Sequence, residues 1–113
     1  MNSAAYKIFE QAIRERKQVA CIYGGYRREL CPILLGHSGD EERALTFQVG
    51  GASRSGLPVG GEWRCLTLSK ASFARLHEGE WKSGDSHAQP QGCVEIVDLD
   101  ANPDSPYSPK RLA

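Results

Sequence analysis

Apolar residues near the start of the chain recur at steps of three and four, whereas further along they alternate with polar residues. Over residues 3–17, Phe9, Ala12 and Ile13 share one side of a helical wheel, and charged residues occupy much of the rest. This spacing predicts an amphipathic helix. Ser3 suits the N-cap position, because its side chain can accept a hydrogen bond from the first turn. We expect this helix to pack on a sheet.

A period of two follows the helix and predicts a β-hairpin over residues 18–23 and 26–31. Gly24-Gly25 suits a two-residue turn, because both glycines tolerate positive φ. In the register that this turn sets, Cys21 faces Arg28 on one side of the hairpin. The residues expected on that face are Val19, Cys21, Tyr23, Tyr26, Arg28 and Leu30.

Four later segments also alternate and predict strands: residues 43–49, 62–68, 73–77 and 94–99. Residues 37–42 predict a polar turn, residues 69–72 a single turn and residues 78–92 a loop. One helix followed by short antiparallel strands is typical of a mainly β (α+β) fold with a small, strongly curved sheet or barrel. We expect one domain over residues 1–100, with residues 101–113 forming an extended, proline-rich tail.

Charge alone points to no partner. The 113 residues include 14 basic and 14 acidic side chains, so the formal net charge is zero. This excludes a polycation that holds nucleic acid by bulk charge, and it excludes an acidic disordered chain. Basic residues nevertheless predominate in residues 1–35 and 63–84, and acidic residues in 36–62 and 85–113. A local anion-binding surface is compatible with the neutral total.

No stretch of the chain is apolar enough to span a bilayer, and the first twelve residues lack the apolar core of a signal peptide. We therefore expect a cytoplasmic protein with no membrane contact. The four cysteines, Cys21, Cys31, Cys65 and Cys93, are then expected to be buried, reduced thiols. Cys21 and Cys31 point to opposite hairpin faces, which disfavours a disulfide between them. Zinc binding is the weaker alternative, because no Cys-x-x-Cys pair occurs.

The most unusual segment is residues 50–61, in which five of twelve residues are glycine. Glycine-rich loops let backbone N–H groups approach an anion, and Ser53, Arg54 and Ser55 would add further donors. The segment is neither a P-loop nor a dinucleotide-binding fingerprint, because it lacks Gly-Lys-Ser/Thr and no helix follows it. A long flexible hairpin loop is the alternative interpretation.

Arg28 is a second candidate, since it shares its predicted face with apolar and aromatic side chains. A charge in that setting needs a carboxylate, carbonyl groups or a ligand anion, and it can stack on Tyr23 or Tyr26. Trp63 and Arg64 form a similar pair of aromatic ring and planar cation after the glycine-rich loop. A structural ion pair for Arg28 and ordinary packing for Trp63 are the alternatives.

The sequence contains no recognisable catalytic motif. His37, His77 and His87 fall in or beside predicted loops and are expected to be solvated, as are the acidic residues Asp98, Asp100 and Asp104. Neither a Gly-x-Ser-x-Gly elbow nor a His-Glu-x-x-His motif occurs. We therefore expect no enzymatic activity, no cofactor and no bound metal.

Two motifs resemble a known family. The first, Tyr-x-Gly-x-x-Arg-x-x-x-Pro, is formed by Tyr23, Gly25, Arg28 and Pro32. The second, Gln-x-x-Gly-x-Ser-x-Ser-Gly, is formed by Gln48, Gly51, Ser53, Ser55 and Gly56. Together with residues 63–68, they resemble compact stand-alone members of the WYL domain family, over roughly residues 8–77. The resemblance implies a bacterial protein with an Sm-like small β-barrel that binds nucleotide or nucleic-acid ligands and has a regulatory role.

The sequence thus predicts a non-catalytic ligand-binding module for a nucleotide or single-stranded nucleic acid. The expected ligand contacts are Tyr23, Arg28, Gln48, Ser53, Arg54, Ser55, Trp63 and Arg64. One alternative is a protein-interaction or homo-oligomeric self-assembly module that uses exposed barrel edges and the loop tip at residues 57–59. A remote alternative is a small hydrolase that acts through Ser53 or Ser55.

Overall fold

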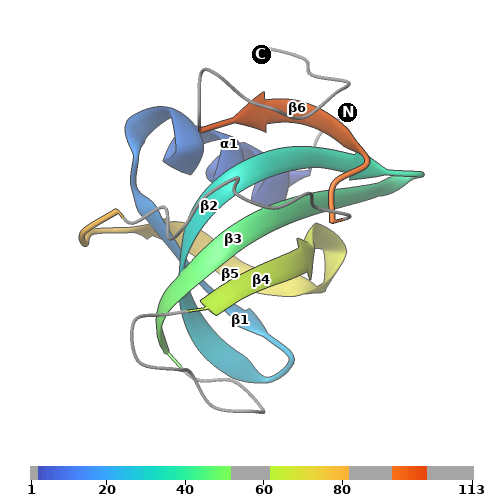
Figure 1. The fold of residues 1–113 in the computed structure, drawn as a ribbon. Helices are drawn as coiled ribbons and strands as arrows, with labels where there is room; N and C mark the ends of the chain where they lie inside the picture. The colour runs from blue at the N-terminus through green and yellow to red at the C-terminus, as the bar shows by residue number, and fades with distance from the viewer. Residues whose placement is uncertain (1–2, 52–61, 82–92, 102–113) are drawn as a thin grey trace.

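One helix and a six-stranded antiparallel sheet make up the structure, a computed structural model that describes residues 3–51, 62–81 and 93–101 (Figure 1). The mainly β prediction with one leading helix is confirmed. The elements are α1 (Ala4–Glu15), β1 (Gln18–Tyr23), β2 (Tyr26–Ser38), β3 (Glu41–Gly51), β4 (Glu62–Thr67), the 3-10 turn η1 (Leu68–Lys70), β5 (Ala71–His77) and β6 (Ile96–Asp100).

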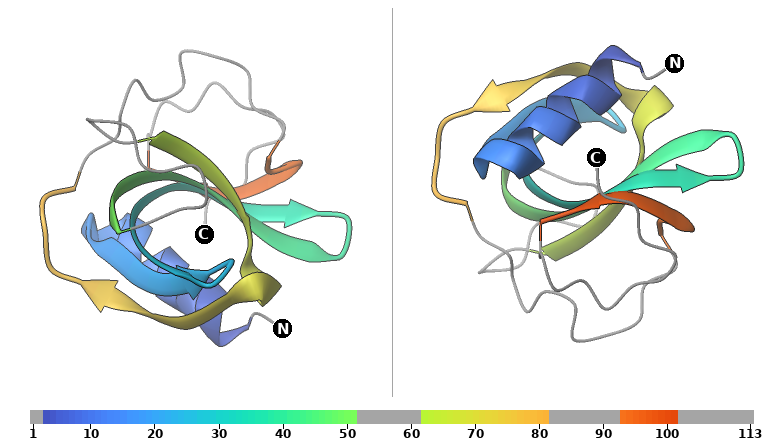
Figure 2. Two further views of the ribbon diagram at one scale, coloured as in Figure 1. Left: turned by 90° about the horizontal axis from the view of Figure 1, so that it is seen from below. Right: turned by 90° about the horizontal axis from the view of Figure 1, so that it is seen from above.

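The predicted helix is present, with both ends set by local contacts. The Ser3 side chain accepts a hydrogen bond from the Tyr6 backbone N–H at 3.1 Å, as expected of an N-cap. The helix ends at Glu15, and the C-cap residue Arg16 adopts a left-handed conformation with φ of 57°. The buried face consists of Tyr6, Phe9, Ala12 and Ile13. Through this face, α1 packs chiefly on β2 and β5 (Figure 2).

The β1–β2 hairpin has the predicted register. Cys21 faces Arg28, and Tyr23 faces Tyr26 across the turn. Gly24 has a φ of 62° and Gly25 a φ of 82°, the left-handed values that the two-residue turn requires. The hairpin therefore carries Arg28 into the sheet, as the alternation predicted.

Strand β2 is longer than predicted. The expected polar turn over residues 37–42 is reduced to Gly39 and Asp40, because β2 continues to Ser38 and β3 begins at Glu41. The added part of β2 is central in the sheet, pairing with β3 on one side and with β6 on the other. Residues 32–35 of this part form a continuous apolar run, which does not alternate with polar residues because both faces of the strand are covered.

The sheet is open. Its strands follow the order β4-β3-β2-β1-β5, and β6 pairs with β2 beyond the end of β1. Strands β4 and β5 are the two edges, and η1 leads the chain from one edge to the other. No ladder pairs β4 with β5 within the described residues, so the expected closed barrel is not confirmed. The strong curvature is evident in Figure 2.

Two later strands are shifted from their predicted positions. Strand β5 begins at Ala71 rather than at residue 73, since the turn before it is the earlier η1. A register shift opposite β1 accompanies Phe73, which has a φ of 55° and is 80% exposed. Strand β6 begins at Ile96, two residues later than predicted, although Val94 before it is buried.

The cysteine prediction is wrong for two of the four residues. Cys65 and Cys93 form a disulfide with their Cα atoms 5.6 Å apart, whereas Cys21 and Cys31 are free and buried, as predicted. The error arises because β4 and the segment before β6 are distant in sequence and adjacent in space. The disulfide also leaves no set of four thiols for zinc.

Several predictions concern residues outside the described ranges. These are the loop donors Ser53, Arg54 and Ser55, the tip at 57–59, His87, Asp104 and the tail from residue 102. Among the helices that are described, none has the length and apolar character needed to cross a membrane.

Candidate functional site

Three neighbouring strands place two arginines on one glutamine. Arg28 of β2 donates from Nη1 to Oε1 of Gln48 on β3 at 3.3 Å, and Arg64 of β4 donates from Nε to the same oxygen at 3.2 Å. The Gln48 amide nitrogen donates to the Gly50 carbonyl oxygen at 3.0 Å, which fixes the orientation of the amide. We call Arg28, Gln48 and Arg64 the arginine cluster.

Sheet register explains why these side chains meet. Gln48 pairs with Leu30, two residues after Arg28, and it lies two residues from Thr46, the partner of Arg64. Residues two apart on a strand share a face, so the three polar side chains point to the same side of adjacent strands. The buried Thr46 hydroxyl donates to the Arg64 carbonyl oxygen at 3.1 Å and helps to hold β4 in this register.

Arg28 is a buried cation held by neutral groups. Its residue is 8% exposed, and its Nε donates to the Tyr23 carbonyl oxygen at 3.1 Å. The guanidinium carbon lies 5.4 Å from the Tyr23 ring centroid and 6.0 Å from that of Tyr26. Among the described residues, no carboxylate contacts Arg28. Desolvation, and then the nearby charge of Arg64, lower the pKa of the Arg28 guanidinium.

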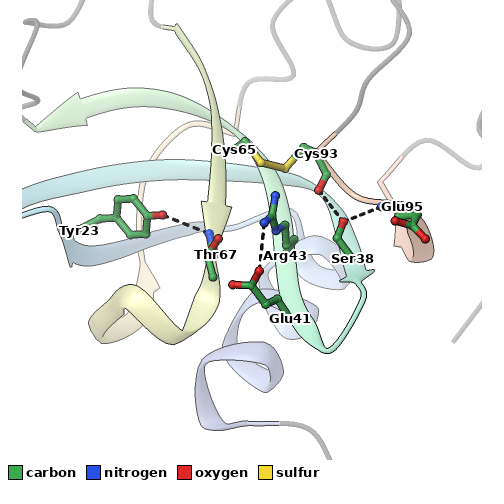
Figure 3. Close-up of polar contacts among 8 residues, drawn as sticks. All are labelled: Tyr23, Ser38, Glu41, Arg43, Cys65, Thr67, Cys93 and Glu95. Carbon is green, nitrogen blue, oxygen red and sulfur yellow. Dashed lines mark hydrogen bonds and ion pairs between the residues drawn. A yellow bond between two sulfur atoms is a disulfide. The ribbon is translucent and has the colours of Figure 1, made fainter.

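Tyr23 contacts both the arginine cluster and the edge strand β4. Its hydroxyl oxygen accepts a hydrogen bond from the Thr67 backbone N–H at 3.2 Å, which ties the end of β4 to β1 (Figure 3). Its carbonyl oxygen and its ring both contact Arg28. The predicted proximity of Tyr23 and Arg28 is therefore confirmed.

The described ends of the glycine-rich loop both lie at the cluster. Gly51, the last residue of β3, pairs with Arg28, and Glu62, the first residue of β4, pairs with Gln48. Gly51 has a φ of 86°, and a Cβ at this position would overlap the Arg27 carbonyl oxygen. Glycine is thus required for β3 to approach β2 this closely.

Trp63 does not join the cluster. It precedes Arg64 on β4, so its side chain points to the other face of the strand. There it packs edge to face on Phe47, with the ring centroids 5.3 Å apart. Its predicted role as a ligand contact beside Arg64 is not supported by this geometry, and the packing alternative fits better.

A second polar cluster lies where α1, β2 and β6 meet. Oδ2 of Asp98 accepts a hydrogen bond from the Tyr6 hydroxyl at 2.7 Å and lies 2.8 Å from Nδ1 of His37. The Tyr6 and His37 rings stack with their centroids 5.7 Å apart. Burial and the hydrogen bond to Asp98 raise the pKa of the Tyr6 phenol. We call Tyr6, His37 and Asp98 the aspartate cluster.

The aspartate cluster corrects two sequence predictions. His37 and Asp98 were expected to be solvated, yet each is partly buried and paired. His77 was also expected to be solvated, and its Nδ1 lies 3.0 Å from Oε1 of Gln18. Sequence reasoning missed these pairs because neither the register of β6 on β2 nor that of β5 on β1 has a local signal. The neighbouring Ser38 hydroxyl is not part of the aspartate cluster, since it donates to the Cys93 carbonyl oxygen at 3.0 Å.

The two clusters differ in the chemistry that they allow. In the arginine cluster two guanidinium groups donate to the same neutral amide oxygen, and guanidinium groups are suited to binding carboxylate or phosphate. The aspartate cluster matches one acid with two donors. Comparisons with protein-family models, with curated proteins and with solved structures found no match to this chain.

Proposed function

We propose that the protein is a non-catalytic module that binds an anionic ligand at the arginine cluster, with a nucleotide or single-stranded nucleic acid as the ligand. One observation carries the proposal: among the described residues the buried Arg28 contacts only neutral groups, and it shares its amide acceptor with a second arginine. A regulatory role of the WYL type belongs to the same proposal.

Electrostatics favour an anion at this position. Burying a guanidinium group costs free energy that neutral acceptors offset only in part, and a neighbouring like charge adds to the cost. A phosphate group would relieve both terms, since its negative charge offsets the two cations and it accepts strong hydrogen bonds from a guanidinium group. Ligand binding would therefore be strongest at low ionic strength, where screening is weakest.

The aromatic residues favour a ligand that carries a base. Tyr26 is 36% exposed and lies beside Arg28, so it would offer a ring face on which a base could stack. In this arrangement the arginines hold a phosphate and Tyr26 contacts the base. The loop donors Ser53, Arg54 and Ser55 would add hydrogen bonds from the segment whose two ends flank the cluster.

Titration tests the proposal. ATP, AMP and a short oligothymidylate would be titrated at low salt into the wild type and into the Arg28→Met and Arg64→Met variants. We expect each substitution to weaken binding at least about tenfold, the typical loss for a buried charged contact. The matched control is Arg75→Met on β5, an exposed arginine outside the cluster. Absence of binding, or equal weakening by the control, would overturn the proposal.

Phe73 favours a second candidate function, a protein-interaction module. A large apolar side chain that is 80% exposed on the edge strand β5 is a suitable anchor for a partner protein. Its φ of 55° lies in the left-handed region, where a non-glycine residue is strained. Light scattering over a range of concentrations, with Phe73→Ser as the variant, tests self-association through this residue. A strict monomer would exclude self-assembly.

A further inference from the structure

The disulfide joins the two polar clusters through the strands that carry them. Cys65 follows Arg64 on β4, and Cys93 opens the segment that leads to β6 and Asp98 (Figure 3). Cys65 is exposed, whereas Cys93 is 7% exposed. Cys65, on the edge strand β4, is therefore the more exposed of the two bonded residues.

Solvent exposure directs thiol chemistry to Cys65. Thiol–disulfide exchange requires a thiolate to approach a sulfur atom, so exposed disulfides are the reactive ones. The remaining cysteines, Cys21 and Cys31, are buried, and burial raises the pKa of the Cys21 thiol. Because both thiols are buried, we expect neither Cys21 nor Cys31 to react with an external thiol or disulfide. Attack at the Cys65 sulfur would expel Cys93 as the leaving thiolate.

The structure can accommodate the reduced pair. The Cys93 sulfur lies 3.4 Å from the Ala44 carbonyl oxygen, which would accept a hydrogen bond from the Cys93 thiol once it is formed. The Ser38 hydroxyl donates to the Cys93 carbonyl oxygen and accepts from the Glu95 N–H, each at 3.0 Å (Figure 3). These contacts do not involve the disulfide, so the segment stays docked when the bond breaks.

Strand β4 is more dependent on the bond. It is an edge strand whose ladder is with β3 alone, and two of its contacts reach parts of the structure other than β3. One is the hydrogen bond from the Thr67 N–H to the Tyr23 hydroxyl, and the other is the disulfide at Cys65. Arg64 is the residue next to the disulfide. Reduction would therefore loosen the strand where it presents Arg64 to Gln48.

We propose that the Cys65–Cys93 disulfide is a reversible exchange site for small thiols, and that its oxidation state tunes anion affinity at the arginine cluster. The second half of this inference rests on the proposed function. In the first step, a thiolate attacks the Cys65 sulfur, a mixed disulfide forms, and Cys93 leaves as a thiolate that takes up a proton. In the second, another thiolate attacks the small-molecule sulfur and releases the Cys65 thiol. The protein gains two electrons and two protons, and two small thiols become one disulfide.

Glutathione buffers test the exchange. The full chain would be equilibrated over a range of reduced-to-oxidised glutathione ratios, quenched by alkylation and analysed by mass spectrometry. We expect a reversible transition confined to Cys65 and Cys93, with the mixed disulfide mapped to Cys65. A pair that stays oxidised in excess reduced glutathione while the chain remains folded would overturn the exchange. A mixed disulfide at Cys93 would overturn the assigned direction of attack.

Anion titration of the two redox forms tests the coupling. With ATP as the probe, we expect the reduced protein to bind about fivefold or more weakly than the oxidised protein, the lower end of the range for coupled sites. The variant with both Cys65→Ser and Cys93→Ser should bind like the reduced protein and ignore the glutathione ratio. Circular dichroism would verify that the variant is folded, and Cys65→Ala with Cys93→Ala is the second variant.

The outcomes separate the two proposals. Equal ATP affinity in both redox forms would overturn the coupling and leave the anion site intact. Failure of the oxidised protein to bind any of the three anionic probes would overturn the proposed function and the coupling with it. The exchange itself would still be decided by the mass spectrometry.

Discussion

The arginine cluster and the aspartate cluster both depend on β2, yet they balance charge in opposite ways. In the aspartate cluster, one carboxylate serves two donors, Tyr6 and His37. In the arginine cluster, two cations share the amide oxygen of Gln48. The first arrangement pins α1, β2 and β6 together through contacts with one carboxylate. In the second, no carboxylate among the described residues contacts Arg28, and this contrast underlies the proposed ligand site.

The comparison predicts different consequences of substitution. Removing the carboxylate of Asp98 should lower stability, because Tyr6 and His37 lose their shared partner. Removing the Arg28 cation, which no carboxylate of the described residues contacts, should change stability little and ligand binding strongly. The four predictions below run from the largest expected effect on stability to the smallest.

The largest effect should come from the disulfide that links the two clusters. Replacing both Cys65 and Cys93 by serine removes a cross-link that spans 28 positions of the chain. The entropy of loop closure predicts a loss of about 3–4 kcal/mol in the free energy of unfolding. Urea denaturation of the variant and of the oxidised wild type measures it. A loss below about 1 kcal/mol would show that the cross-link does not restrain the unfolded chain as supposed.

The Asp98→Asn variant should rank second. The carboxamide keeps the shape but loses the charge that Tyr6 and His37 share, so we expect a loss of about 2–3 kcal/mol. Urea denaturation at neutral pH measures it, with the exposed Glu95→Gln as the matched control on the same segment. If the two variants lost equal stability, the aspartate cluster would have no special role.

Alkaline pH should weaken the aspartate cluster through Tyr6. Its pKa is raised in the folded protein, so the folded state favours the neutral phenol. The resulting stability is fully present below the unfolded pKa of about 10 and is lost as the pH rises above that value. Tyr6→Phe should cost about 1 kcal/mol at neutral pH and make the alkaline decline shallower. Denaturation curves from pH 8 to 11 test this, and an unchanged slope would contradict it.

The smallest change in stability should accompany Arg28→Met. The substitution removes a buried charge together with its hydrogen bonds and ring contacts, and these terms oppose each other. We expect the ligand-free protein to change by less than about 1 kcal/mol while ATP affinity falls at least about tenfold. A large loss of stability without ligand would place Arg28 among the structural residues, as in the aspartate cluster.

Local signals predicted the hairpin and part of the candidate site. Gly24-Gly25 sets the turn, and alternation then requires Tyr23 and Arg28 to share a face. Arg64 and Gln48 were also expected near a ligand, and the structure brings both to Arg28. Trp63 was not brought there, because the same alternation directs it to the opposite face of β4.

Contacts between distant segments were not predicted. The extension of β2 to Ser38 was missed because its apolar run does not alternate when both faces are covered. The pairing of β6 with β2 has no sequence signal near either strand. Because this pairing was not predicted, the contact between His37 and Asp98 was not predicted either. The disulfide was missed for the same reason.

The sequence by itself determined the helix with its Ser3 cap, the hairpin register and the alternation that buries Arg28. Each of these depends on steric and hydrogen-bonding preferences that act within a few residues. Tertiary structure decided that the sheet stays open, that Cys65 meets Cys93, and which acid and cation find partners. Those outcomes depend on how strands far apart in the chain share one curved sheet. The charge total of the chain is neutral, and only the fold shows that Asp98 meets Tyr6 and His37, while Arg28 contacts no carboxylate of the described residues.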